Sequence, residues 1–256
     1  MEKMEYPAIL NTMDYYFTFT HKEQITPDMY YFHFTPNVPV PYTSGQYMEF
    51  HLPHAHADSR GEKRYFTLVS SPTEKDICIA TRINDASSSF KKALLAMHTG
   101  TTLRVNELEG DFIVPDDPLT KILLIAGGIG ITPYRSMIKY IIDSNLKRDI
   151  ALMYTAKTTS DILFKDLFDC AHKDGVTSRY YVDESLPTGW DGEKGYITPK
   201  IIKKDVPDYL DRMVYVSGPE AMVEKFEKMI LKMGVADNNF KRDFFDNYTE
   251  TYQESS

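Results

Sequence analysis

The chain has 256 residues, a formal net charge of −8 and a pI near 5.4, which argues against a nucleic-acid-binding protein held by a basic face. Its hydrophobic fraction of 42% is that of a globular protein, and its length suffices for one large domain or two of ordinary size. No apolar run reaches the roughly 18 residues of a membrane span. The acidic N-terminus, interrupted by Pro7, is unlike a signal peptide, so we expect a soluble, cytoplasmic protein.

The chain has two cysteines, Cys78 and Cys170, which are far apart and form no C-x-x-C pair. They cannot by themselves ligate a structural zinc ion or a four-cysteine iron-sulfur cluster. His54 and His56 form an H-x-H pair of the kind that ligates metals, but no further ligand follows at a useful spacing. We therefore expect this pair to lie in a surface loop and predict no metal site.

Residues 15–114 contain short apolar runs separated by turn residues. Several runs alternate apolar and polar residues and are rich in Tyr, Phe, Thr and Val, which is typical of half-buried antiparallel strands. Six such strands within about 100 residues predict a small barrel or sandwich. One helix interrupts them in "SSSFKKALLAM", where serines precede a single apolar face that contains Phe90, Ala93, Leu94 and Met97.

After Pro115 and Pro118 the pattern changes to apolar strands that alternate with amphipathic helices. The predicted strands are "KILLIA", "DIALMYTA", "TSRYYVDE" and "DRMVYVSG", and helices are expected near 133–144, 161–175, 198–206 and 219–234. This alternation predicts a parallel sheet covered by helices on both faces. We place the domain boundary near residue 117.

The stretch "GGIGITP", residues 127–133, follows the first strand of the predicted parallel sheet. Glycines there let backbone approach a phosphate, and the next helix offers its N-terminal N–H groups, with Pro133 suited to the first turn. The classical G-x-G-x-x-G pattern is not met, because Pro133 stands where the third glycine should be. A tight turn without a ligand would use the same glycines, so both interpretations stay open here.

A second stretch, "RYFTLVSSP", begins at Arg64 in the predicted antiparallel domain. Strand alternation places Arg64, Phe66 and Leu68 on one face, with Tyr65 and Thr67 on the other. Taken alone, this pattern also fits an ordinary edge strand.

The order of "R-x-aromatic-T", "GGIGITP" and later "YVSGPEAM" resembles the ferredoxin-NADP(H) reductase superfamily of flavoproteins. The resemblance spans about residues 15–248. It implies a six-stranded antiparallel FAD-binding barrel over residues 12–117 and a parallel α/β NAD(P)-binding domain over residues 118–248. It also implies that hydride passes from NAD(P)H to flavin N5 and that electrons pass on to a separate acceptor. That acceptor would be ferredoxin or flavodoxin, an oxygenase partner, or a small molecule. The alternative is a non-catalytic or partner-dependent electron-transfer subunit of a larger redox complex.

The family's flavin motif, R-x-Y-[ST], falls on Arg64, Phe66 and Thr67. The resemblance implies that Arg64 neutralises the FAD pyrophosphate and that Thr67 hydrogen-bonds the flavin ring near N5. Phe66 replaces the usual tyrosine, which keeps stacking but removes a phenolic hydrogen bond, and Tyr65 is a partial substitute.

Two further segments match the family's flavin elements. Ser88 and Ser89 stand at the helix start that holds the pyrophosphate, although simple N-capping would use the same serines. Backbone of Ala80, Thr81 and Arg82 is expected to line the flavin.

For the nicotinamide nucleotide, the resemblance implies two loops: the first contains Gly127, Gly128, Gly130 and Thr132, and the second contains Ser217, Gly218 and Pro219. Ser217 stands where the family often has a catalytic cysteine. Phe245, with Asp243 as acidic partner, matches the C-terminal aromatic that covers the flavin; Tyr248 is a second candidate, and aromatic residues that only close the core are the alternative. Thr155 and Lys157 occupy the position that pairs a 2′-phosphate, which slightly favours NADPH.

Overall fold

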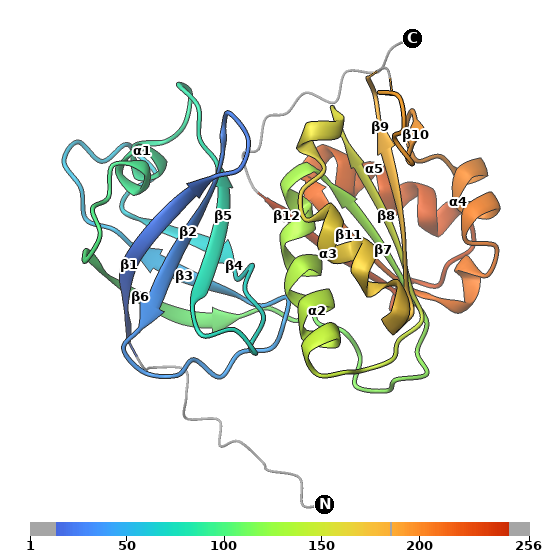
Figure 1. Cartoon of the computed structure of the whole chain (residues 1–256), viewed down its shortest axis with the longest axis horizontal. Helices are drawn as coiled ribbons and strands as arrows, with labels where there is room; N and C mark the ends of the chain where they lie inside the picture. Colours follow the sequence, from blue (N-terminus) through green and yellow to red (C-terminus); the bar gives the residue numbers. More distant parts are fainter. Residues whose placement is uncertain (1–13, 185, 246–256) are drawn as a thin grey trace, which may run out of the picture. The chain divides into compact units, whose positions relative to one another are not determined.

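The computed structural model describes residues 14–184 and 186–245, and the chain divides into two compact units after Asp111 (Figure 1). The division lies a few residues before the predicted boundary near residue 117. No helix within the described residues is both long and apolar enough to span a bilayer.

The first unit is a six-stranded antiparallel sheet curled into a half-barrel, as predicted, with strand order β4-β3-β6-β1-β2-β5. Its strands are β1 (Tyr15–Gln24), β2 (Met29–Pro36), β3 (Tyr47–His51), β4 (Lys63–Thr67), β5 (Ile77–Arg82) and β6 (Thr102–Glu109). Just beyond β4, the N–H of Val69 donates to the carbonyl of Cys78 in β5 at 2.8 Å. The two edge strands are therefore bridged by the chain that follows β4.

Alternating residues of these strands fill the core of the first unit. Phe17, Phe34 and Phe50 have no exposed surface, and their rings pack at centroid distances of 5.6 to 6.3 Å. The helix α1 (Ser89–Leu95) contributes Phe90 and Leu94, both fully buried, as its predicted apolar face requires.

The second unit is a six-stranded parallel sheet with strand order β10-β9-β8-β7-β11-β12. Its strands are β7 (Ile122–Gly127), β8 (Ile150–Ala156), β9 (Val176–Val182), β10 (Glu193–Lys194), β11 (Met213–Pro219) and β12 (Phe240–Phe245). Figure 1 shows α2 (Thr132–Asp143) and α3 (Lys165–Cys170) over one face, with α4 (Pro199–Asp205) and α5 (Glu220–Lys232) over the other. All six residues of β7 are buried, as expected of a strand covered on both faces.

Strand order reverses at β7. The chain proceeds from β7 to β8 and β9 on one side, and β11 and β12 then add on the other side. In sheets of this kind, ligands bind at the carboxyl ends of the strands beside such a reversal. The carboxyl ends of β7 and β11, at Gly127 and Pro219, meet that condition.

Two details of the second unit differ from the sequence-based expectation. The helix expected over 161–175 is broken into a 3-10 turn at Thr159–Asp161, α3, and a 3-10 turn at Ala171–Asp174. The break occurs because Phe164 adopts a left-handed conformation, with φ of 59°. The Asp161 carboxylate closes a capping box with Thr158 at the first of these 3-10 turns. The two edge strands, β10 and β12, were also not predicted as strands.

Candidate functional site

Arg64 is held at the edge of the half-barrel by its own turn. One of its terminal nitrogens donates to the carbonyls of Arg60, Gly61 and Lys63 at 2.8, 3.2 and 2.5 Å. The guanidinium carbon lies 5.3 Å from the centre of the Phe90 ring, at the start of α1. Its other terminal nitrogen has no hydrogen-bond partner and lies 3.5 Å from an oxygen of Asp58. The turn thus fixes one side of the fork and leaves the other directed at an anion.

The anion beside Arg64 is the Asp58 carboxylate. It accepts a hydrogen bond from the Ser89 N–H at 3.0 Å and pairs with Arg60 at 2.9 Å. The Arg60 bond, followed by the Ser89 N–H, holds the pKa of Asp58 well below its usual range. Ser89 also receives the Asp58 N–H on its hydroxyl at 2.9 Å and contacts His54 Nε2 at 2.9 Å. Asp58, which we did not predict, therefore occupies the position expected of a phosphate, between Arg64 and the start of α1.

Four cations lie close together beside the start of α1, and we call this group the cationic corner: Arg60, Arg64, Arg82 and Lys91. Burial, followed by the charges of Arg60, Arg64 and Arg82, lowers the pKa of Lys91 to about 8. The Lys91 ammonium donates to the Arg82 carbonyl at 3.2 Å, and Arg82 pairs with Asp28 at 3.4 Å. A bound diphosphate would relieve the repulsion that lowers this pKa. The donor set therefore fits the pyrophosphate of a dinucleotide.

The remaining predicted flavin residues lie on β4, on β5 and at the start of α1. Phe66 packs against Phe50 and Phe90 and is 9% exposed, while the hydroxyl-bearing Thr67 is 7% exposed. Tyr65 faces outward, half exposed, and its hydroxyl donates to Glu107 at 2.5 Å. Arg64 and Phe66 share the Phe90 side, as strand alternation predicted, and Tyr65 is on the opposite side.

Ser88 and β5 complete the predicted flavin half. Ser88 caps α1 by accepting the Lys91 N–H at 3.3 Å and is buried. Ala80 and Thr81 are buried at the end of β5, next to the partly exposed Arg82. The observed contact of Ser88 is therefore that of an N-cap, and Ser89 is the serine that contacts an anion, the Asp58 carboxylate.

In the second unit, glycine stands at three of the predicted positions for different structural reasons. A Cβ on Gly130 would lie 2.2 Å from the Ser217 carbonyl oxygen, and one on Gly127 would lie 2.0 Å from the Met222 sulfur. Gly130 is needed for the close packing of the β7 and β11 turns, whereas the Met222 side chain of α5 can move away from a Cβ on Gly127. Gly128 has φ of +53°, and nothing lies within 4 Å of its added Cβ. Gly128 is therefore the glycine over which a ligand has room.

Tyr154 of β8 holds the glycine turn, residues 127–132, by a hydrogen bond to its backbone. Its hydroxyl donates to the carbonyl of Gly128 at 3.0 Å or to that of Asp161 at 3.1 Å. Thr132 begins α2 and is 2% exposed, with Pro133 in the first turn as expected. No sequence signal identified Tyr154, because its strand pattern is that of an ordinary buried residue.

Ser217 and Asp243 come together at the carboxyl ends of β11 and β12. They are register partners, and the Ser217 hydroxyl donates to Asp243 at 3.4 Å. Burial raises the pKa of Asp243 to about 6, against a smaller lowering by the Ser217 bond. Phe245 ends β12 opposite Pro219 in the register. Tyr248 lies outside the described residues.

The raised pKa of Asp243 makes stability depend on pH. The folded protein binds this proton more tightly than the unfolded chain, so the contribution is fully present below the ordinary pKa of 3.8 and is lost as pH rises through about 6. Asp243→Asn should therefore be more stable than wild type by up to about 2 kcal/mol near neutral pH, with the difference shrinking at about pH 4. Urea unfolding at both pH values measures this. The exposed Asp237 gives a control, Asp237→Asn, and equal pH dependence of the two variants would contradict the assignment.

Residues 124–228 match the model of the oxidoreductase NAD-binding domain family. The glycine betaine monooxygenase reductase subunit of Chromohalobacter salexigens is 27% identical over 87% of this chain and 61% of its own length. NADH-cytochrome b5 reductase 1 of Ajellomyces capsulatus is 32% identical over 67% of this chain and 58% of its own length. The crystal structure of the cytochrome b5 reductase domain of Ulva prolifera nitrate reductase has the same fold, with a TM-score of 0.77 and 22% identity over 91% of this chain and 98% of that one.

The chain has the fold of the ferredoxin-NADP(H) reductase superfamily, and its residues 124–228 match the NAD-binding domain family. Flavin and pyridine nucleotide are the cofactors of that superfamily. The chain spans about three fifths of the length of the first curated relatives that it matches, at 61%, 57% and 58%.

The two residues expected from the sequence to pair a 2′-phosphate lie at and just beyond the end of β8. Thr155 is buried at 5% exposure, whereas Lys157 is exposed. Glu184 accepts hydrogen bonds from the N–H and the hydroxyl of Thr159 at 2.5 and 2.9 Å, and its own N–H donates to the Lys157 carbonyl. The cation of Lys157 and the carboxylate of Glu184 thus both stand near the end of β8, and Glu184 was not predicted.

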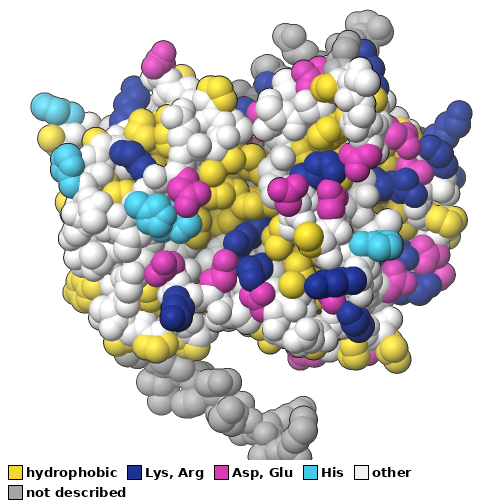
Figure 2. Space-filling model, in the orientation of Figure 1, with side chains coloured by type: hydrophobic (Ala, Val, Ile, Leu, Met, Phe, Trp, Pro, Cys, Tyr) yellow, Lys and Arg dark blue, Asp and Glu magenta, His cyan; other side chains and the backbone are white. Residues whose placement is uncertain are grey.

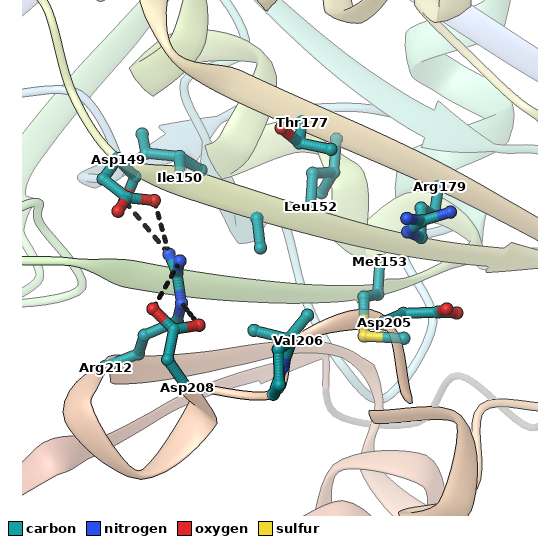
Figure 3. Close-up of a pocket in the computed structure, with 12 residues that line it drawn as sticks. Asp149, Ile150, Leu152, Met153, Thr177, Arg179, Asp205, Val206, Asp208 and Arg212 are labelled. Atoms are coloured by element: carbon teal, nitrogen blue, oxygen red, sulfur yellow. Dashed lines mark hydrogen bonds and ion pairs between the residues drawn. The ribbon is translucent and has the colours of Figure 1, made fainter. Parts of the chain in front are cut away.

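A pocket of about 140 Å³ in the second unit lies at the amino ends of β8 and β9, opposite the glycine turn (Figure 3). Arg212 crosses it, donating to Asp149 at 2.8 Å and, through two nitrogens, to Asp208 at 2.8 and 3.0 Å. Arg212, together with Lys121, lowers the pKa of Asp208 to about 2. These groups pair with one another, and the pocket lies at the end of the strands opposite to the glycine turn.

Proposed function

We propose that this protein is an FAD-dependent NAD(P)H oxidoreductase that passes electrons to a separate acceptor. The observation that carries the proposal is the cationic corner of the first unit, where Arg60, Arg64, Arg82 and Lys91 act on one another. Asp58 pairs with Arg60 and Arg64, and Asp28 pairs with Arg82; a bound diphosphate would add further negative charge beside the four cations. The cytoplasmic location expected from the sequence stays part of this proposal.

Each half of the protein has a defined task in the proposed reaction. Arg64 and Lys91 bind the diphosphate, and the Ser89 N–H exchanges Asp58 for a phosphate oxygen. The open backbone at Gly128 receives the nicotinamide nucleotide, and Ser217 with Asp243 provides a polar surface at the adjacent strand ends. Thr67 and Phe245 keep the alignment roles implied by the superfamily. Bound FAD supplies the capacity to take up a hydride and release its electrons to an acceptor.

The lone chain, reconstituted with FAD, should reduce ferricyanide at the expense of NADH or NADPH. Turnover should depend on added FAD after the protein has been stripped of flavin. A properly folded, FAD-loaded chain that gives no turnover with either coenzyme would favour the alternative, a partner-dependent electron-transfer subunit. That alternative draws support from the relatives named as reductase subunits, of glycine betaine monooxygenase and of stachydrine N-demethylase.

We propose an oxygenase component as the physiological acceptor, because those two relatives are named for such systems; ferredoxin and flavodoxin remain the other protein acceptors expected from the sequence. Figure 2 shows acidic and basic side chains interspersed on the face drawn, without a large area of one sign. Docking through surface charge alone would therefore be weak and salt-sensitive on that face.

We also propose NADPH as the slightly preferred donor, through the exposed Lys157. Lys157→Ala should raise the KM for NADPH several-fold and leave that for NADH unchanged, because only NADPH carries the 2′-phosphate. Steady-state rates with both coenzymes measure this. Lys173→Ala, at an exposed position near the amino end of β9, is the matched control. Equal changes for the two coenzymes would count against the role of Lys157.

A further inference from the structure

Two histidines and a glutamate form a compact cluster on the outer face of the half-barrel. His21 of β1 and His33 of β2 are cross-strand partners, and their rings stack 4.3 Å apart at an angle of 4°. Glu23 follows two residues after His21, and one of its oxygens lies 3.4 Å from the Nε2 atom of each histidine. Within the described part of the chain, these three residues place their ligand atoms within 4.8 Å of one another.

A β-bulge creates this arrangement. The register between β1 and β2 shifts between Phe19 and His21. Without the extra residue, strict alternation would direct His21 to the core side with Phe17 and Phe19. The bulge instead turns His21 outward, opposite His33, whose neighbours Phe32 and Phe34 fill the core.

The distances match the edges of a metal coordination polyhedron. For tetrahedral zinc with bonds of about 2.0–2.1 Å, nitrogen and oxygen ligands stand about 3.4 Å apart. Both histidine-to-glutamate distances have this value. Cys78 is paired with His33 in the register, and its sulfur lies 3.9 Å from His33 Nε2, close to the roughly 3.6 Å of a nitrogen–sulfur edge.

Hydrogen bonds of Thr20 select the tautomer that binds metals. The Thr20 hydroxyl donates its proton to the His33 carbonyl at 3.0 Å, so it can only accept from His21 Nδ1, which lies 3.1 Å away. In a neutral His21 ring, the proton is therefore on Nδ1 and the lone pair on Nε2 faces Glu23. In this tautomer the Nε2 lone pair and the Glu23 carboxylate face one another at 3.4 Å, an arrangement that a metal ion between them would satisfy.

We propose that His21, Glu23 and His33 bind a divalent transition-metal ion of the Zn²⁺ class, toward which the Cys78 sulfur, outside the 4.8 Å cluster, would move as a fourth ligand. Imidazole, carboxylate and thiolate form a donor set suited to such ions. The stacked rings must tilt for both lone pairs to converge, and His21, with 53% of its side chain exposed, has room to turn. The ion would join three adjacent strands, β1, β2 and β5. This proposal does not rest on the reductase function.

The test uses the full chain, purified without a histidine tag and stripped with a chelator. Titration with Zn²⁺ should give one site per chain and raise the thermal midpoint of the wild type. His21→Ala and Glu23→Gln alter half-exposed side chains, so they should fold, yet weaken Zn²⁺ binding on the order of 100-fold. His98→Ala and His56→Ala, at exposed positions elsewhere, should bind as wild type does.

Two results would overturn the site: no stoichiometric Zn²⁺ binding by wild type, or undiminished binding by His21→Ala and Glu23→Gln. Co²⁺ tests the fourth ligand separately, because a thiolate ligand adds a sulfur-to-cobalt charge-transfer band. Cys78→Ser should lose that band while it still binds Co²⁺. A band that persists in Cys78→Ser, or is absent from the wild-type complex, would remove Cys78 from the ligand set.

Discussion

Arg64→Ala is expected to bind FAD on the order of 100-fold more weakly than wild type. The side chain is mostly buried, and it directs its fork at the carboxylate that stands at the start of α1. Truncation of such a charge removes about 2–5 kcal/mol of binding free energy, and about 2.7 kcal/mol corresponds to 100-fold. Arg64→Lys should recover part of this affinity, because lysine keeps the charge and loses the fork. Flavin fluorescence quenching on titration with FAD measures the affinity.

Two further variants accompany this prediction: one is a control with unchanged FAD affinity, and the other should bind FAD more tightly. Arg104 is an exposed arginine of β6 in the same unit and pairs with Asp14. Arg104→Ala should therefore bind FAD as wild type does. Asp58→Asn should bind FAD several-fold more tightly, because it removes the carboxylate that competes for Arg64 and the Ser89 N–H. Unchanged FAD affinity in Arg64→Ala, or weaker affinity in Asp58→Asn, would contradict the assignment of this corner.

Gly130→Ala is expected to destabilise the second unit by about 3 kcal/mol or more, a fall of roughly 10 °C in its unfolding midpoint. The new Cβ would lie 2.2 to 2.5 Å from the Ser217 carbonyl and the Gly218 nitrogen. All of these atoms are backbone, so the two turns at the β7 and β11 ends must separate. Trp190 is the single tryptophan of the chain and lies in this unit, so its fluorescence reports the transition.

Gly128→Ala, in the same turn, is the matched control for Gly130→Ala. Gly128 has φ of +53°, inside the left-handed region that L-residues can adopt, and nothing lies within 4 Å of an added Cβ, so alanine there should cost only about 1 kcal/mol of backbone strain. Similar losses in the two variants would show that the close approach of the β7 and β11 turns does not govern the stability of this unit.

The layout of both sheets was predictable because burial imposes simple periods on the chain. The six residues of β7 are apolar because both faces are covered, and the strands of the first unit alternate because one face is core. The shortened α3 was not predictable, because the apolar period continues through Phe164, whose left-handed conformation delays the start of the helix to Lys165. β12 was missed because "KRDFF" mixes charge and apolar residues without a clear period.

Motifs in the sequence predicted which segments form the candidate sites, but not the contacts that each residue makes there. "GGIGITP" identified the turn at the strand reversal, yet only packing distinguishes Gly130, which touches the next turn, from Gly128, which faces open space. Asp58 carried no motif, because its place beside Ser89 depends on a loop that folds back over 31 residues of sequence. The bulge that turns His21 outward is likewise invisible to a strict alternation of strand faces.

The central claim is that one chain binds both a flavin and its reductant. FAD-loaded protein, titrated anaerobically with NADPH and then separately with NADH, tests it most directly through the visible absorbance of the flavin. We predict that at least one coenzyme bleaches the flavin band with near-stoichiometric addition. A protein that does not retain FAD, or whose bound flavin is bleached by dithionite and by neither coenzyme, would contradict the account.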